Sequence, residues 1–356
     1  MEKKVVRGVT IFLLILTICV SFVLLNYPDL HVFALQKRVE YAAKVKTGYS
    51  VLDLMRDETE VLAQSSQGED AQKQLRLEVP ENVKLNQVKV TNQPVYQTVE
   101  IEIPKIEKSY FYDYPMIGSS DHISDITFDV EGDKGVIDIV LDSVYELDIQ
   151  KKGHYMYLDF VNPRDIYDYI VVVDAGHGGN APGATKQGIT EKDIDLDIVK
   201  KLKKKLDDSD KKIGVYYTRL DDTNPSLESR VTLANDLSAD LFLSVHNNST
   251  ASGRMSGING TEVMYRVSDK SGKSKEFAEV CLNSLLQTLG SQDKGVVAGD
   301  DIYIIRTSQV PVALVEVGFM TNQEELDKLN SSEYQEQCAQ ALYDSILQML
   351  DNLKQE

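Results

Sequence analysis

Residues 171–179 read Val-Val-Val-Asp-Ala-Gly-His-Gly-Gly. With Ile170, the three valines form an apolar, β-branched run that is typical of a buried strand. The glycines that follow predict a tight turn, and this turn presents His177. Ligands bind beyond the carboxyl ends of the strands in an open α/β sheet, so this histidine is a candidate metal ligand or acid–base group. The motif alone is equally consistent with a turn residue held by backbone hydrogen bonds.

Two later stretches repeat this design. A strand-like run at residues 240–245 is followed by His246, and an apolar run at residues 311–319 is interrupted by Glu316. A carboxylate inside an apolar run is costly to bury unless another group pairs with it. Three strands that lead to His177, His246 and Glu316 therefore predict one polar site at one edge of a sheet.

The chain from residue 168 to residue 356 alternates strands with helices. Besides the runs above, we expect strands at residues 213–218, 262–267 and 303–305, and helices that begin near residues 191, 226, 273 and 332. Such alternation predicts an α/β domain with a mostly parallel sheet and helices on both faces. A lysine-rich run at residues 200–205 lies near the end of the first helix, where positive charge suits the helix dipole. We therefore interpret it as a solvated helix face and not as a binding patch.

The preceding region has the period of β-strands. Residues 99–103 and 126–130 alternate apolar and polar side chains, and glycine-containing turns follow such runs. This pattern predicts a small antiparallel β-sandwich at residues 79–165, in which no group of chemically active residues is apparent. Residues 26–78 are polar and mixed, and we interpret them as a stalk or linker.

The N-terminal residues predict where in the cell the protein is located. Residues 1–8 carry Lys3, Lys4 and Arg7, and an uncharged apolar run at residues 9–25 follows. This run has about the minimum length of a membrane-spanning helix, and its basic flank favours the cytoplasmic side. We therefore expect a single-pass membrane protein with its catalytic domain outside. A cleaved signal peptide is the alternative, with residues 32–34 as the cleavage site.

Composition excludes some classes of function. The 356-residue chain has a formal net charge of −18, which argues against nucleic acid as a partner. It lacks a Gly-x-Ser-x-Gly elbow, a phosphate loop and a dinucleotide fingerprint. Of its three cysteines, Cys281 and Cys338 lie on apolar helix faces, which suits core residues better than nucleophiles.

A hydrolytic zinc site fits the remaining polar residues best. Such a site uses three protein ligands, often two histidines and one glutamate, and leaves a position for water. His177 and His246 supply two ligands. The spacing leaves the third open among four acids: Glu191, Asp193, Asp174 and Glu316.

Four blocks in order resemble the zinc-dependent N-acetylmuramoyl-L-alanine amidases of the Amidase_3 family. They are residues 171–179, Glu191-Lys192-Asp193, Ser-Val-His-Asn-Asn at 244–248 and Val-Glu-Val-Gly-Phe at 315–319. The resemblance covers about residues 170–350. It implies that His177, Glu191 and His246 bind one zinc ion per chain and that Glu316 is the catalytic carboxylate.

The resemblance also implies a substrate. These enzymes hydrolyse the amide bond between the lactyl group of N-acetylmuramic acid and L-alanine in peptidoglycan. The chain departs from the family pattern at Ala175, where proline is usual, and at Asn247, where alanine is usual; neither position supplies a ligand.

The sandwich is similar in outline to AMIN modules. The alternatives are a zinc peptidase that cuts within the stem peptide and a non-catalytic wall-binding protein. The sequence assigns no activating partner.

Overall fold

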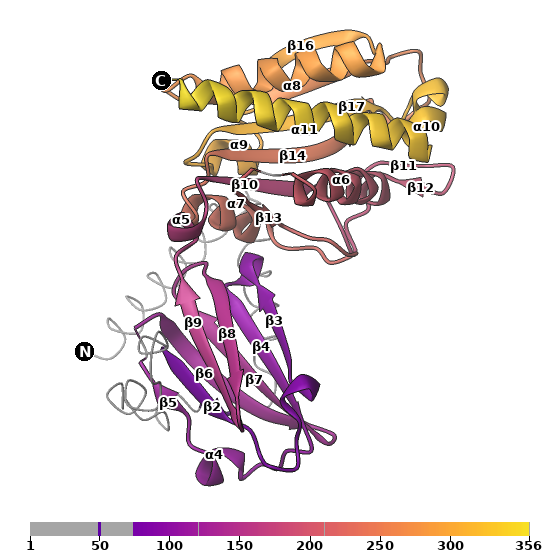
Figure 1. The fold of residues 1–356 in the computed structure, drawn as a ribbon. Coiled ribbons are helices and arrows are strands. Elements are labelled where there is room, and N and C mark those ends of the chain that lie inside the picture. The colour runs from indigo at the N-terminus through magenta and orange to yellow at the C-terminus, as the bar shows by residue number, and fades with distance from the viewer. Residues whose placement is uncertain (1–48, 51–73, 120, 210, 356) are drawn as a thin grey trace, which may run out of the picture. The chain divides into compact units, whose positions relative to one another are not determined.

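The computed structural model describes residues 49–50, 74–119, 121–209 and 211–355 (Figure 1). The predicted basic flank and the apolar run at residues 9–25 lie outside the described residues, as does most of the predicted linker. Within that linker, however, residues 75–78 form a strand, β2, that pairs with β9.

The expected single-pass membrane location is corrected. No helix in the described part of the chain combines the length and the apolar composition needed to cross a bilayer. The longest of these helices, α11 (Ser332–Lys354), has sufficient length, but its exposed face carries acidic residues such as Glu336, Asp344 and Asp351.

The β-rich region consists of two antiparallel sheets. One has the strand order β1-β6-β7-β4-β3 and the other β5-β2-β9-β8. Side chains from both sheets, among them Leu75, Ile101, Phe128 and Leu158, share one apolar core, so the region is a sandwich. The strands are β1 (Tyr49–Ser50), β2 (Leu75–Glu78), β3 (Lys89–Gln93), β4 (Thr98–Pro104), β5 (Ile117–Gly118), β6 (Ile123–Glu131), β7 (Lys134–Leu141), β8 (Glu146–Lys152) and β9 (Tyr155–Val161).

Short helical segments accompany these strands. They are the 3₁₀ turns η2 (Leu85–Gln87) and η3 (Pro94–Tyr96) and the one-turn helices α4 (Tyr110–Asp113) and α5 (Pro163–Ile166). Tyr110 and Phe111 of α4 pack their rings against Phe128, so α4 contributes to the apolar core of the sandwich.

The C-terminal region contains a six-stranded sheet in the order β13-β10-β14-β17-β15-β16. Its neighbours pair in parallel, except that β15 runs antiparallel to β17. The mostly parallel sheet predicted from the sequence is therefore confirmed. The strands are β10 (Tyr169–Ala175), β13 (Ile213–Tyr217), β14 (Leu241–Asn248), β15 (Thr261–Tyr265), β16 (Asp293–Ala298) and β17 (Val312–Phe319).

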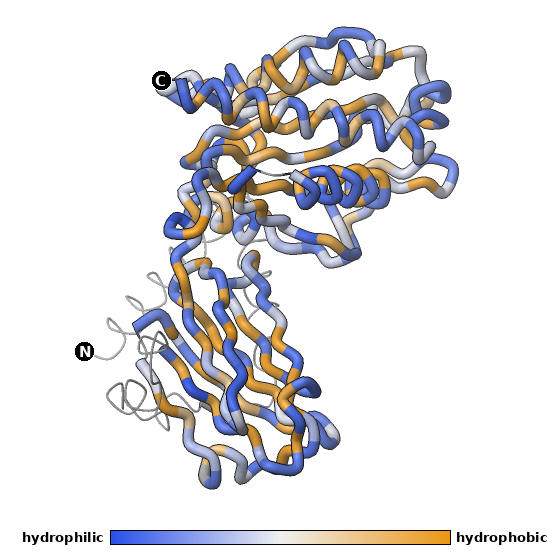
Figure 2. Tube along the Cα trace, in the orientation of Figure 1, coloured by the Kyte–Doolittle hydropathy of each residue, from blue (hydrophilic) through white to orange (hydrophobic). Residues whose placement is uncertain are grey.

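Alternation along the central strands separates two apolar layers. Val171 and Val173 of β10 face one layer, while Ile170 and Val172 face the other. Helices α6 (Glu191–Asp207), α8 (Lys273–Leu289) and α11 line the first layer, and α7 (Leu227–Asp236) and α9 (Tyr303–Thr307) line the second. Figure 2 shows the hydrophobic residues concentrated in the strands of both regions. The remaining elements are the hairpin β11 (Thr185–Lys186) and β12 (Ile189–Thr190) and the helix α10 (Gln323–Leu329).

Two local predictions are wrong. Residues 303–305, expected as a strand, lie in helix α9, because a short apolar run does not distinguish a strand from a buried helical turn. Strand β16 was not expected, since residues 293–298 are polar at their start and contain Gly295 with φ 88°. Its place at the edge of the sheet explains why it lacks the apolar run of a central strand.

Candidate metal centre

His177 stands in the turn that follows β10. Its backbone has φ 58°, in the left-handed region that is costly for a residue with a Cβ. The preceding residue is glycine for a steric reason: a Cβ at Gly176 would lie 2.3 Å from Cε1 of His246. The turn therefore brings the backbone of one histidine loop directly against the imidazole of the other.

His246 and Glu316 lie side by side on the two central strands β14 and β17. The parallel register pairs His246 with Glu316, so both side chains occur at the same level of the sheet. His177 follows β10, the strand on the other side of β14. The three strand ends that the sequence singled out thus meet at one edge.

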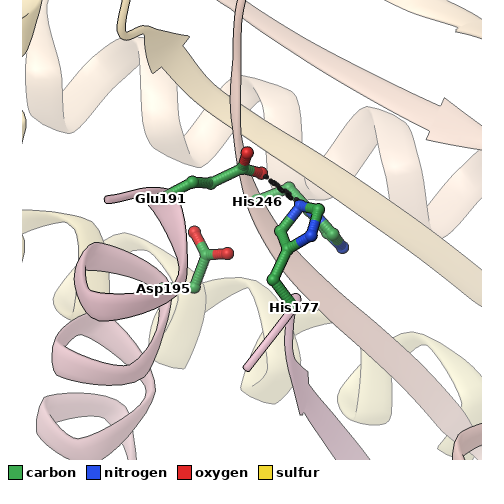
Figure 3. A group of neighbouring side chains, drawn as sticks. All are labelled: His177, Glu191, Asp195 and His246. Carbon is green, nitrogen blue, oxygen red and sulfur yellow. Dashed lines mark hydrogen bonds and ion pairs between the residues drawn. The ribbon is translucent and has the colours of Figure 1, made fainter. Parts of the chain in front are cut away.

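Glu191 connects the two histidines. Its Oε1 lies 2.9 Å from Nε2 of His177 and 3.1 Å from Nδ1 of His246, and its Oε2 accepts a hydrogen bond from the amide of Ala184 at 2.8 Å (Figure 3). Burial alone would raise the pKa of the Glu191 carboxyl, but hydrogen bonds from His177 and His246 outweigh burial and hold that pKa well below its usual range. A carboxylate is therefore available between two imidazoles.

Donor atoms of four side chains converge here. One ligand atom each from His177, Glu191, Asp195 and His246 lies within 4.8 Å of the others. Two imidazoles and a carboxylate are the donor set of a hydrolytic zinc site, so the residues present fit that metal. Asp195 was missed from the sequence, although its spacing four residues after Glu191 places both on one helix face.

Glu316 has a different environment from Glu191. The residue is half-buried, and its Oε2 is buried without a hydrogen-bond partner among the described residues. Burial raises the pKa of the Glu316 carboxyl well above its ordinary value, and the charges of Glu191 and Glu262 raise it further. A carboxyl group whose pKa is raised above its ordinary value is suited to proton transfer.

The two other acids considered for the third ligand are engaged elsewhere. Asp174 is buried, and its Oδ1 accepts hydrogen bonds from Arg230 and from the hydroxyl of Thr218, both at 2.6 Å. Asp193 is exposed and accepts a hydrogen bond from the hydroxyl of Thr190. Of the four acids, the structure thus brings Glu191 into contact with both histidines.

Two buried arginines hold the loop that carries His177, and sequence spacing alone gave them no role. Arg230 donates to the carbonyls of Ala175 and His177, and Arg219 donates to those of Ala175 and Gly176. Charge-assisted hydrogen bonds of this kind are stronger than neutral ones, so they compensate for the unfavourable φ of His177.

The chain is similar in sequence to known proteins. The Amidase_3 family model, described as N-acetylmuramoyl-L-alanine amidase, matches residues 171–348. The uncharacterised protein YqiI of Bacillus subtilis is 37% identical over 176 residues, which are 49% of this chain and 82% of that protein. The amidase LytC of the same organism is 38% identical over 176 residues, but these cover only 34% of its length.

A solved structure is also similar in sequence. An N-acetylmuramoyl-L-alanine amidase from Clostridium difficile is 36% identical, and the match covers 51% of this chain and 97% of that one, with a TM-score of 0.48. From the family match and the relative YqiI, we conclude that this chain belongs to the Amidase_3 family of N-acetylmuramoyl-L-alanine amidases.

Proposed function

We propose that this chain hydrolyses the amide bond between the lactyl group of N-acetylmuramic acid and L-alanine of the peptidoglycan stem peptide. Family membership supports the class of reaction. The observation that carries the proposal is the convergence of His177, Glu191 and His246 at the sheet edge, where Glu316 lies beside His246.

His177, Glu191 and His246 would hold one zinc ion. When bound, zinc polarises a carbonyl group and lowers the pKa of water toward about 7. The exposed fractions of the side chains suit substrate entry, since His177 is 30% exposed and His246 16%, whereas Glu191 is 7% exposed. The substrate would therefore approach from the side of the histidines, while Glu191 stays anchored by the amide of Ala184.

Glu316 would move the proton. Its carboxylate would accept a proton from the attacking water and return it to the leaving amine of L-alanine. The raised pKa of Glu316 supports this role, because a base that is too weakly basic accepts no proton at neutral pH. The buried Oε2 without a partner leaves an acceptor available for this transfer.

We assign the proposed reaction to one part of the chain. The four converging residues and Glu316 all belong to residues 168–356, which we propose as the catalytic domain. The sandwich would be an accessory module, and its two antiparallel sheets support a relation to AMIN modules.

The test is digestion of purified peptidoglycan sacculi by the purified full-length chain, with the masses of the products measured. We expect glycan strands with free lactyl groups and peptides that begin with L-alanine. Cleavage between residues of the stem peptide would instead identify a peptidase, and sacculi that bind the protein without any release of products would identify a wall-binding protein.

Metal content provides the second test. The full-length chain should hold about one zinc ion, as expected for a mononuclear site. His177→Ala should remove most of the zinc and the hydrolysis. His154→Ala is the matched control, because His154 is an exposed histidine in the turn between β8 and β9 of the sandwich. Full zinc occupancy of His177→Ala would contradict the ligand assignment.

A further inference from the structure

Asp195 is a buried carboxylate that the proposed mechanism does not use. It lies on α6 one turn after Glu191 and is 0% exposed. Figure 3 shows its carboxylate beside the two histidines and Glu191. An oxygen of Asp195 lies within 4.8 Å of the donor atoms of those three residues.

Among the described residues, one of the two Asp195 carboxylate oxygens has a hydrogen-bond partner and the other has none. Oδ1 accepts a hydrogen bond from Nδ2 of Asn247 at 2.7 Å, whereas Oδ2 is buried without a hydrogen-bond partner in the described structure. The side-chain oxygen Oδ1 of Asn247 is also buried without a hydrogen-bond partner among the described residues. Asn247 therefore fixes one carboxylate oxygen of Asp195 and leaves the other available.

The Asp195 carboxyl group has no ion-pair partner in the described structure. Within the described residues, no lysine or arginine side chain forms an ion pair with it, and the charged groups that act on it are the carboxylates of Glu191 and Glu316 and the guanidinium of Arg219. A buried carboxylate is tolerated when a positive charge pairs with it, and metal ions do so commonly.

We propose that Asp195 is a fourth protein ligand of the zinc site, through Oδ2. The inference rests on the site proposed above and extends its protein donor set to two imidazoles and two carboxylates; the attacking water would then be a fifth ligand, a coordination number that catalytic zinc can also adopt. Asn247 then acts as a positioning residue, because its hydrogen bond to Oδ1 orients the carboxylate. A donor set with more carboxylate oxygen also favours harder divalent ions. The site should therefore prefer zinc over Mn²⁺ less strongly than a site with one carboxylate does.

The variant that tests this is Asp195→Asn in the full-length chain. The amide keeps the shape and a hydrogen bond to Asn247 but is a poor zinc ligand. We expect the zinc dissociation constant, measured by competition with a chelating dye, to rise at least about tenfold. The preference for zinc over Mn²⁺ should also increase. Asp197→Asn, an exposed change of the same kind on the same helix, should leave both quantities unchanged.

A second variant separates direct ligation from support. Asn247→Ala removes the hydrogen bond but keeps the Asp195 carboxylate, so zinc affinity should fall much less than in Asp195→Asn. Equal losses in the two variants would show that Asp195 acts through Asn247 and would overturn the proposal. Unchanged zinc affinity in Asp195→Asn would overturn it as well.

Two measurements keep the outcome independent of folding and of the proposed function. A zinc-loaded crystal structure of the unmodified chain should place Oδ2 about 2.0–2.2 Å from the ion, and a non-bonding distance would refute ligation. His177→Ala is assayed in parallel. If it loses zinc while Asp195→Asn keeps wild-type affinity, only the inference about Asp195 fails; if it keeps zinc, the proposed metal centre itself fails.

Discussion

The sandwich at residues 74–161 and the α/β region at residues 169–355 bury different kinds of side chain. Both have cores of leucine, isoleucine, valine and phenylalanine. Among the described residues, however, every buried charged side chain, and every buried polar one other than tyrosine, belongs to the α/β region, from Asp174 to Ser345. The difference lies in the charged groups, which among the described residues only the α/β region buries.

This comparison shows which region includes buried charges that add little to the free energy of unfolding. Burying an ion pair such as Asp174 with Arg230 often costs as much free energy as it returns, and an apolar replacement of similar volume is frequently as stable. Among the described residues of the sandwich, no charged side chain is buried, so this cost does not arise there. The α/β region accepts it around one edge of its sheet, which is the pattern expected where chemistry rather than stability determines the residues.

The largest expected effect concerns Glu316. Glu316→Gln keeps the shape of the side chain but does not accept a proton, so hydrolysis should fall about 10²–10⁴-fold, the usual contribution of a general base. Zinc content should stay at the wild-type level. Product release from sacculi and metal analysis of the same samples measure the two quantities.

The matched control lies in the sandwich. Glu100 is also a half-buried glutamate on a strand, and Glu100→Gln should leave hydrolysis unchanged. Glu191→Gln supplies the opposite case, because the loss of a ligand should lower zinc content and hydrolysis together. If Glu316→Gln loses zinc while Glu191→Gln keeps it, the two roles are exchanged.

The second effect concerns stability. Asp174→Asn leaves the buried Arg230 guanidinium without its carboxylate partner, which typically costs about 3–5 kcal/mol. Urea unfolding of the full-length chain, monitored for each region, should show this loss in the α/β region and not in the sandwich. Equal destabilisation of both regions would indicate that they unfold as one unit.

The pH dependence of Asp174→Asn has a defined sign. Burial alone would raise the pKa of Asp174, but Arg230, followed by His246 and the hydroxyls of Ser244 and Thr218, lowers it to about 2. A lowered folded-state pKa gives stability that is complete above the ordinary value of 3.8 and is lost as the pH falls through about 2. The stability difference between wild type and Asp174→Asn should therefore be constant near neutral pH and shrink below about pH 4.

The same contrast explains which parts of the fold the sequence predicts. The apolar runs before His177 and His246 identify the central strands, because a strand buried on both faces is a continuous hydrophobic run. Edge strand β16 has no such run, and the turn of helix at residues 303–307 has one too short to classify. Local pattern thus predicts elements well where burial is complete.

The site was predicted only in part for a related reason. Residue types at strand ends indicated His177, His246 and Glu316 as candidates, but the contacts of the four acids considered for the third ligand depend on partners far along the chain. Asp174 is engaged by Arg230, which lies 56 residues later, and Asp195 contacts Asn247 across 52 residues. Such pairings follow from the tertiary fold, so spacing alone left four acids open and omitted Asp195.

A smaller effect should be equal in the two regions. Ile101 of β4 and Ile198 of α6 are both buried, with exposed fractions of 1% and 0%. Isoleucine to valine in a core typically costs about 0.5–1.5 kcal/mol, so Ile101→Val and Ile198→Val should destabilise their own regions similarly. Urea unfolding measures this cost. A much larger cost at Ile198 would show that the apolar cores also differ.

The smallest expected effect concerns the ion pairs of Glu102 in the sandwich. Glu102 on β4 pairs with Lys89 at 2.7 Å and with Lys134, and hydrogen bonds from these lysines lower the pKa of Glu102 to about 2. The lysine side chains are 66% and 47% exposed, so water and salt screen both pairs.

Glu102→Gln should therefore change the free energy of unfolding far less than Asp174→Asn does. The small stability that the Glu102 ion pairs contribute should be present above the ordinary pKa of 4.5 and lost as the pH falls through about 2. High salt should weaken it. Urea unfolding of both variants at low salt and in about 1 M salt, where the Debye length is only ~3 Å, tests this. A loss at Glu102 as large and as salt-resistant as that at Asp174 would mean that burial is not what separates the charged groups of the two regions.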